Sequence, residues 1–384
     1  MRRELQREII RTALDLAASA ATQMADAPLV LSVSDYLSPA MYDLERRMIF
    51  RERPVVACLS CDLREPGDHI ATESGGVPLL VVRQSDGSLR AFVNICRHRG
   101  SPIAAPGLGH VSRSFACTFH GWAYDLDGRN INRPHSSGGF DDIDGGDSAC
   151  FGLLARPVAE AHGFVWVRAE GDTPIDIDAL LCGMGDELDA FAFGDFHRFG
   201  ATVTEWDANW KLLADTFLET YHVPALHPKT VGRHFLARPS MCRAFGPNIR
   251  FHSLMKTLLD MRDTPESTWE LLPHGTVEYL IAPNTIVNYT VDHVALYQFV
   301  ALSPERTRVV LTLYTPHPVH EDADVTNYRR TLDLHMRVSG GEDFTKQEQV
   351  HRSLASGAMP DVVFGRNEPG AILFHTGLHA LLES

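Results

Sequence analysis

The chain has 384 residues, 44% of them hydrophobic, which is enough to bury more than one core, so we expect two domains. Its formal net charge of -14 argues against a nucleic-acid-binding protein, because such proteins present a basic surface. The seven cysteines are an odd number and are scattered along the chain, which argues against a secreted disulfide framework.

The sequence shows no targeting or membrane segment. The apolar stretch near the N-terminus is interrupted by Asp15, which argues against a signal peptide. No run approaches the roughly 18 apolar residues that a membrane helix needs. We therefore expect a protein without membrane partners, located in the cytoplasm.

Residues 3–24 predict a helix, since their apolar side chains recur at helical spacing. A short helix is expected next, with Ser38 as its N-cap and Pro39 at its first position. From 53 to 170, short apolar runs are separated by Asp-Gly turn dipeptides, a pattern typical of a small antiparallel β region.

A second domain is expected from about residue 197. Residues 206–223 carry apolar side chains at helical spacing, and Pro224 is expected to end that helix. Residues 276–316 alternate like strands, and the tail from about 322 is mostly helical. The organisation is therefore a β-rich region followed by an α+β domain.

Two cysteine–histidine pairs fall where predicted strands end, Cys96-x-His98 and Cys117-x2-His120. Sets of two cysteines and two histidines bind either zinc or an iron–sulfur cluster in which the histidines hold one iron. Zinc fingers usually place the two cysteines together. Here each loop supplies one residue of each type, which favours the cluster.

A second group of possible metal ligands lies in "NWKLLADTFLETYHVPALHP". Asp215, Glu219 and His222 are spaced to share one helical face, and a helix end at Pro224 would let His227 turn back toward them. Two histidines with one carboxylate form the ligand set of mononuclear non-haem Fe(II) that activates dioxygen. The pair of histidines alone is only moderately specific, because a helix end with two surface histidines explains it equally well.

Together the two groups resemble the catalytic α subunit of Rieske non-haem iron ring-hydroxylating oxygenases. The motifs "CRHRG", "CTFHGWAYDLDG", "HGFVWV" and "NWKLLADTFLETYHVPALHP" carry the resemblance, which extends from about residue 40 to 384. It implies an α+β protein with a small antiparallel β Rieske domain at 41–170. The catalytic domain at 171–384 would hold an antiparallel sheet covered by helices, and a helical arm at 1–40 would pack with it.

The resemblance also implies a [2Fe-2S] cluster and the residues that bind it. Cys96 and Cys117 would bind one iron of the cluster, and His98 and His120 would bind the other. Trp122 is expected to pack beneath the cluster loops, together with Tyr124.

For the mononuclear Fe(II), the resemblance implies His222 and His227 as ligands together with a carboxylate from far downstream. Asp343 in "GEDF" stands where such families place this carboxylate, and Glu342 and Glu348 are nearby alternatives.

Two further carboxylates lie close to these histidines in the sequence. Glu219 matches the acidic residue that links the cluster of one subunit to the iron of its neighbour. Most relatives have aspartate there, whereas glutamate resembles some trimeric demethylases and quaternary-amine oxygenases. Asp215 could orient iron ligands, although a helix-surface carboxylate is the simpler interpretation.

The implied function is that of a terminal oxygenase, which would use O2 and electrons from NAD(P)H to hydroxylate an aromatic or related small organic substrate. The implied partners are a separate reductase, in some systems a ferredoxin, and two more copies of the chain in a homotrimer. O- or N-demethylation or oxidation of a quaternary amine is the alternative. A Rieske electron carrier without oxygenase activity and a zinc-stabilised binding protein are less favoured hypotheses.

The substrate is expected in an apolar pocket built from residues between about 230 and 300 and from the last helices. Five aromatic residues could form a cage for a quaternary ammonium group, although core packing is the favoured interpretation for them: Trp206, Trp210, Trp269, Tyr279 and Tyr289.

Overall fold

The computed structural model describes residues 1–137, 139–140, 143 and 148–383. The chain divides into two compact units. The first comprises Met1–Arg46, Asp178–Ala192 and Phe196–Ser384, and the second comprises Arg47–Ile177 and Phe193–Asp195.

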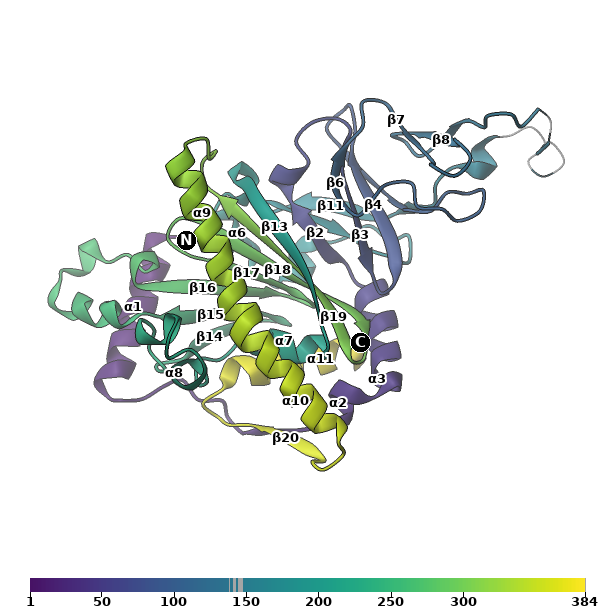
Figure 1. Cartoon of the computed structure of the whole chain (residues 1–384). Coiled ribbons are helices and arrows are strands. Elements are labelled where there is room, and N and C mark those ends of the chain that lie inside the picture. The colour runs from purple at the N-terminus through teal and green to yellow at the C-terminus, as the bar shows by residue number, and fades with distance from the viewer. Residues whose placement is uncertain (138, 141–142, 144–147, 384) are drawn as a thin grey trace. The chain divides into compact units, whose positions relative to one another are not determined.

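The second unit is built from three small antiparallel sheets (Figure 1). A five-stranded sheet has the order β10 (Ala155–Arg156), β5 (Leu89–Val93), β4 (Val77–Arg83), β3 (Asp68–Ser74) and β6 (Gly107–His110). A three-stranded sheet contains β11 (Val158–Ala161), β12 (Phe164–Val167) and β2 (Val55–Leu59). The third sheet contains β7 (Ser114–Ala116), β8 (Ala123–Asp125) and β9 (Asn130–Asn132).

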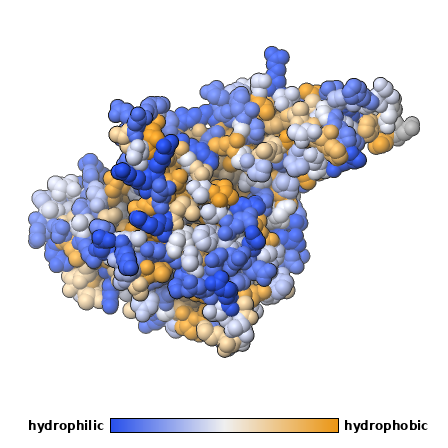
Figure 2. All heavy atoms as spheres, in the orientation of Figure 1, coloured by the Kyte–Doolittle hydropathy of each residue, from blue (hydrophilic) through white to orange (hydrophobic). Residues whose placement is uncertain are grey.

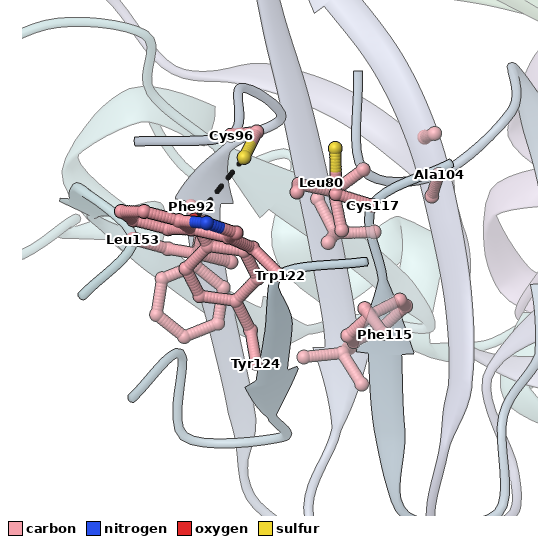
Figure 3. Close-up of a cluster of buried hydrophobic side chains, with 12 residues drawn as sticks. Leu80, Phe92, Cys96, Ala104, Phe115, Cys117, Trp122, Tyr124 and Leu153 are labelled. Carbon is pink, nitrogen blue, oxygen red and sulfur yellow. Dashed lines mark hydrogen bonds between the residues drawn. The ribbon is translucent and has the colours of Figure 1, made fainter. Parts of the chain in front are cut away.

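Strand β4 is buried on both faces and so separates two cores. Leu79 and Val81 pack in a cluster with residues of β2 and β12, whereas Leu80 and Val82 point to the other side. There they join the aromatic cluster shown in Figure 3. The predicted Asp-Gly turns are confirmed, and Gly128 adopts a φ of 79° where a Cβ atom would collide with the ring of Phe92.

The first unit is organised around a seven-stranded antiparallel sheet. Its order is β13 (His197–Trp206), β19 (Arg306–Thr315), β18 (Val294–Ser303), β17 (Thr285–Tyr289), β16 (Gly275–Ile281), β15 (Asn248–Leu254) and β14 (Met241–Phe245). From β14 to β19 each strand pairs with the next one in sequence, and β13 closes the far edge against β19. The predicted strands over 276–316 are thus confirmed.

Helices and one short ribbon accompany this sheet. Helices α9 (Asp322–His335) and α10 (Thr345–Ala355) are joined by a π-helix over Met336–Phe344, and Figure 1 shows the three as one long rod. Strands β1 (Leu29–Ser32) and β20 (Asp361–Phe364) pair with each other. Among the described residues, the remaining α-helices are α1 (Arg3–Ala18), α2 (Ser34–Leu37), α3 (Pro39–Glu45), α5 (Ile177–Leu181), α6 (Gly185–Asp189), α7 (Trp210–Asp215), α8 (Val223–Leu226) and α11 (Pro369–Glu383).

The predicted start of the second helix is correct, whereas the predicted end of the first helix is wrong. Ser38 caps α3 by accepting a hydrogen bond from the backbone of Met41, with Pro39 at the first position as expected. The N-terminal helix is shorter than predicted and is followed by Ala20 at a φ of 51°.

The helix expected over 206–223 is in fact two short helices. Helix α7 stops at Asp215, and Pro224 lies in the first turn of α8 instead of ending a helix. Proline fits there because backbone N–H groups in the first turn of a helix have no acceptor within the helix, so the N–H that proline lacks costs no hydrogen bond.

None of the helices that the structure describes combines the length and apolar character needed to cross a membrane. The face shown in Figure 2 mixes hydrophilic and hydrophobic residues.

Candidate functional site: two groups of metal-binding side chains

In the second unit, each of the two cysteine–histidine loops contains a backbone turn of the same type. The N–H of Gly100 donates to the carbonyl of Cys96, and the N–H of Gly121 donates to the carbonyl of Cys117. Both glycines have a positive φ, 78° and 70°, which a side chain would disfavour. Each histidine therefore lies within a tight turn that begins at its own cysteine.

The four side chains of these loops come together. The rings of His98 and His120 lie 4.5 Å apart. Cys96 and Cys117, which Figure 3 labels, are both buried. Burial raises the pKa of the Cys96 thiol. Burial acts in the same direction on Cys117, but backbone N–H groups, among them that of Phe119, outweigh it and leave the pKa of that thiol below its usual value.

This donor set fits a [2Fe-2S] cluster. Nδ1 of His98 is buried and has no hydrogen-bond partner among the described residues, as expected for an atom that awaits a metal. Arg99 donates to Nε2 of His120 at 2.8 Å, so that Nδ1 of this ring is the nitrogen left for a metal. Two buried sulfurs supported by backbone N–H groups are the usual environment of a cluster.

Aromatic side chains support the loops, as predicted. Trp122 stacks on His98 with a ring separation of 4.9 Å and an interplanar angle of 6°. The hydroxyl of Tyr124 accepts from the backbone N–H of Arg97 at 3.0 Å, which leaves its own hydrogen for Sγ of Cys96 at 3.3 Å. Both aromatic residues thus hold the first loop.

In the first unit, His222, His227 and Asp343 offer ligand atoms that all lie within 4.8 Å of one another. The two histidines flank the single turn of α8, and Asp343 lies in the π-helix. Oδ1 of Asp343 is 3.4 Å from Nε2 of His222 and 2.9 Å from Nε2 of His227. Two imidazoles and one carboxylate form the donor set of mononuclear non-haem iron, so the residues fit this metal.

Carboxylates on the far side of both rings fix their orientation. Nδ1 of His227 contacts Oε2 of Glu342 at 2.5 Å, and Thr230 donates to the same oxygen at 2.7 Å. Nδ1 of His222 contacts Oε1 of Glu219, whose other oxygen accepts from the backbone N–H of His222 at 3.1 Å. With both Nδ1 atoms occupied, the Nε2 lone pairs remain for a metal.

The alternatives to Asp343 have other partners. Glu342 contacts His227 on the side away from Asp343, as described above. Glu348 accepts from the backbone N–H of Asp207 at 2.9 Å. Among the three acidic residues of this segment, only Asp343 belongs to the group with both histidines.

The prediction for Asp215 requires correction. Its carboxylate is buried, so it is not a helix-surface group. It accepts from the hydroxyl of Tyr36 at 3.0 Å and contacts Nε2 of His375 at 2.9 Å. Because α7 ends at Asp215, this residue does not share a helical face with His222, and its partners connect α2, α7 and α11 instead.

A cavity of about 530 Å³ opens beside His222, His227 and Asp343. This volume is in the range of small-molecule sites. Its lining lies between residues 216 and 343. The part from 231 to 297 falls in the range expected for the substrate pocket, whereas the part from 216 to 227 was not expected there. The lining includes apolar side chains from several elements: Phe217, Val231, Phe235, Met255, Leu334 and Val338.

The five aromatic residues considered as a cage do not line this cavity. Trp206 packs against Phe344, Trp210 donates to Glu45 at 3.0 Å, and the hydroxyl of Tyr279 donates to Glu187. Packing, not a cage around a ligand, accounts for them.

A polar wall of the cavity was missed by the sequence analysis. It consists of Ser253, Thr276, Glu278 and Asn288, which come from the adjacent strands β15, β16 and β17. Ser253 pairs with Thr276 across the strands, and Glu278 pairs with Asn288. Burial raises the pKa of Glu278 to about 7. The only signal in the sequence is one acidic residue within the mostly apolar stretch "VEYLI".

Two histidines in the cavity wall were also missed. Nε2 of His335 lies 2.8 Å from Nε2 of His293, and Nδ1 of His335 lies 3.0 Å from the hydroxyl of Tyr297. Burial lowers the pKa of His335 to about 3, so this ring is neutral at ordinary pH.

Family models match both parts of the chain. The model "Ring hydroxylating alpha subunit (catalytic domain)" matches residues 193–384, and the model "Rieske [2Fe-2S] domain" matches residues 53–144.

Curated relatives include both monooxygenases and dioxygenases. The glycine betaine monooxygenase oxygenase subunit of Chromohalobacter salexigens is 27% identical over 324 residues, which are 75% of this chain and 70% of the relative. The chlorobenzene dioxygenase subunit alpha of Cupriavidus sp. (strain PS12) is 32% identical over 192 residues, which are 49% of this chain and only 42% of the relative.

Solved structures share the fold over nearly the whole chain. The quaternary ammonium Rieske monooxygenase CntA in complex with L-carnitine has a TM-score of 0.78 at 20% identity, and the match covers 93% of this chain and 96% of that one. The naphthalene 1,2-dioxygenase from Rhodococcus sp. has a TM-score of 0.74 at 16% identity, with 98% of each chain covered. A monooxygenase and a dioxygenase thus match this chain with similar TM-scores, so the fold does not distinguish between the two reactions. The chain belongs to the ring-hydroxylating alpha subunits of the Rieske non-haem iron oxygenases.

Proposed function

We propose that this chain is the terminal oxygenase component of a multicomponent system, which hydroxylates a small organic substrate with O2. Electrons from NAD(P)H would reach it through a separate reductase and, in some systems, a ferredoxin. The observation that carries the proposal is that His222, His227 and Asp343 converge in the wall of a cavity large enough for an organic molecule.

In this proposal each group of ligands has one task. His222, His227 and Asp343 hold Fe(II), which supplies open coordination positions for dioxygen. Glu219 and Glu342 keep the histidine Nδ1 protons and so present Nε2 to the metal. The apolar side chains of the cavity hold the substrate and exclude water.

The cysteine–histidine loops have the second task. Cys96, Cys117, His98 and His120 hold the [2Fe-2S] cluster, which supplies electrons one at a time. The buried sulfurs and the supporting stack of Trp122 would keep solvent from it.

We further propose that the chain works as a homotrimer. Within each chain, the proposed domains are a helical arm at 1–40, a Rieske domain at 41–170 and a catalytic domain at 171–384. Glu219 of one chain would then connect its His222 to a cluster histidine of the neighbouring chain. An aromatic substrate is one candidate. An amine is the second, favoured by the buried carboxylate of Glu278 in the cavity wall.

A histidine variant with a matched control tests the proposal. His227→Ala should keep the visible spectrum of the cluster but lose product formation from an aromatic and amine panel with NADH and a surrogate reductase. His234→Ala also changes a cavity-lining histidine but leaves the ligand group intact, and it should retain turnover.

Full product formation by His227→Ala would contradict the oxygenase assignment. Loss of electron uptake in both variants would instead indicate damage to the cluster.

A further inference from the structure

The polar wall of the cavity contains a carboxylate whose hydrogen bonding is incomplete. Glu278 is 3% exposed and lies on β16, inside the seven-stranded sheet. Its Oε1 accepts from the hydroxyl of Thr276 and from Nδ2 of Asn288, the latter at 3.2 Å. Ser253 on β15 also favours the charged form of this carboxylate and lowers its pKa, yet Oε2 is buried and has no hydrogen-bond partner among the described residues.

Incomplete hydrogen bonding of a buried carboxylate lowers the stability of the folded state. A buried charged oxygen without a partner costs more than the typical net gain from one hydrogen bond, so native structures rarely keep one without a purpose. Oδ1 of Asn288, the neighbour across the strands, is also buried without a partner in the described part of the chain. Two acceptors on one wall of the same cavity therefore await a donor.

No permanently charged cationic side chain in the described lining balances this wall. Its lining contains Glu219, Glu278, Asp292 and Asp343 but neither lysine nor arginine. Of the four acidic residues, Glu219 is engaged with His222, Asp343 belongs to the ligand group, and the side chain of Asp292 is 52% exposed. Among these four, Glu278 is the deeply buried carboxylate that lies outside the proposed ligand group and still has an oxygen without a hydrogen-bond partner in the described part of the chain.

The rest of the lining is chiefly apolar, which limits what the missing donor can be. Phe217, Phe235 and Leu334 can contact a hydrocarbon body but provide no partner for an anionic group. A quaternary ammonium carries charge but no N–H, so it would leave Oε2 without its hydrogen bond. A protonated amine supplies both the charge and the N–H.

We propose that Glu278 is a substrate-binding residue that accepts a charge-assisted hydrogen bond from the protonated nitrogen of an amine. The apolar body of the amine then fills the cavity beside His222, His227 and Asp343. Asn288 supplies a second acceptor for another N–H of the same nitrogen. This inference rests on the proposed oxygenase function, and it names the chemical class of its substrate.

Binding of three matched probes to the metal-loaded protein without oxygen tests the inference. Benzylammonium carries charge and N–H, benzyltrimethylammonium carries charge alone, and benzyl alcohol is neutral. Calorimetry should show that the wild type binds benzylammonium more tightly than either of the other probes. Glu278→Gln, which keeps the shape, should weaken benzylammonium binding by about tenfold to hundredfold and change benzyl alcohol binding by less than about threefold.

Two further variants control for fold and for general charge. Glu278→Asp keeps the charge and should retain the preference for benzylammonium, which also guards against a folding defect of the glutamine variant. Asp292→Asn removes the same charge from the same cavity at an exposed position, where solvent screens it, and should change the preference by less than about twofold.

Equal affinity of the wild type for benzylammonium and benzyl alcohol would overturn the inference, and so would an unchanged preference in Glu278→Gln. Equally tight binding of benzyltrimethylammonium would overturn the assignment to an N–H group. Because binding is measured without turnover, a protein that prefers benzylammonium but consumes no oxygen would contradict only the proposed function. Turnover of neutral arenes without this preference would contradict only the inference.

Discussion

At the scale of single residues, carboxylates determine what the two histidines of the first unit can do. Glu342 and Glu219 each engage the Nδ1 atom of one ring. Burial opposes the protonated form of His227, yet Asp343 and Glu342 outweigh it and raise the pKa of this ring. Metal binding requires the neutral imidazole, so protons compete with iron for this ring and the affinity for iron should weaken once the pH drops below this raised value.

Removal of the Glu342 carboxylate should weaken iron binding without removing a ligand. We expect Glu342→Ala to lower the affinity for Fe(II) by about 10–100-fold, because His227 loses the partner that orients it. Competition with a chelator measures this loss. Glu348→Ala is the matched control, since Glu348 bonds to the backbone of Asp207. Equal losses in both variants would show that general charge near the π-helix, not orientation of His227, is responsible.

Glu278 should make stability depend on pH. Its pKa in the folded chain is about 7 against 4.5 for the free group, so unfolding releases its proton between these values. The folded state therefore loses roughly 3 kcal/mol as the pH rises from about 4.5 to above 7. Glu278→Gln lacks this loss, so its stability relative to the wild type should increase over that range. Denaturant unfolding at several pH values measures the difference, and a constant difference would contradict the burial argument.

At the scale of elements, the break between α7 and α8 shows which features of this segment local spacing in the sequence can predict and which it cannot. Local spacing identified His222 and His227 because both belong to one short segment. It wrongly extended α7, because Tyr221 continues the apolar pattern although it is 69% exposed. Asp343 was predicted only from the resemblance to a family, and Glu278 was not predicted. Their positions near the histidines depend on contacts between distant segments, which local spacing does not encode.

A buried ion pair links helices α3 and α7. Lys211 on α7 pairs with Glu45 at the end of α3, and each side chain is 3% exposed. Trp210 donates to the second carboxylate oxygen of Glu45 at 3.0 Å. The carboxylate thus has a partner for each of its oxygens.

Breaking this pair should destabilise the first unit. Lys211→Met leaves Glu45 charged and buried, which should cost about 3–5 kcal/mol in the free energy of unfolding. The double variant Lys211→Met with Glu45→Leu removes both charges and should recover much of that loss. Denaturant unfolding compares them. A single variant as stable as the wild type would mean that water or another group compensates Glu45.

At the scale of the whole molecule, the chain keeps its two ligand groups in separate compact units. Cys96, His98, Cys117 and His120 all lie in the second unit, and His222, His227 and Asp343 all lie in the first. Each group can therefore be removed by substitution without altering the ligands of the other. This separation allows a direct test of transfer between chains.

Two inactive variants should complement each other if electrons pass between chains. Cys96→Ser removes a proposed cluster ligand, and His227→Ala removes a proposed iron ligand, so neither should form product alone. Co-expression should restore about a quarter of wild-type turnover through random mixing in a ring. Cys96→Ser co-expressed with the double variant should remain inactive. No recovery in the first mixture would place the transfer within one chain.

The π-helix that carries Asp343 makes the proposed iron site depend on chain length. A π-helix usually represents one residue added to an α-helix, and such additions are frequent at functional sites. Loss of one residue between Met336 and Asp343 would turn the carboxylate by about one residue step around the axis if the winding stayed unchanged, which is about 100° in an α-helix. A return to α-helical winding would offset most of that turn, because each residue of an α-helix turns further than each residue of a π-helix. During evolution this rod could therefore accept substitutions more readily than deletions, since a single-codon deletion would keep the ligand set only if the winding changed with it.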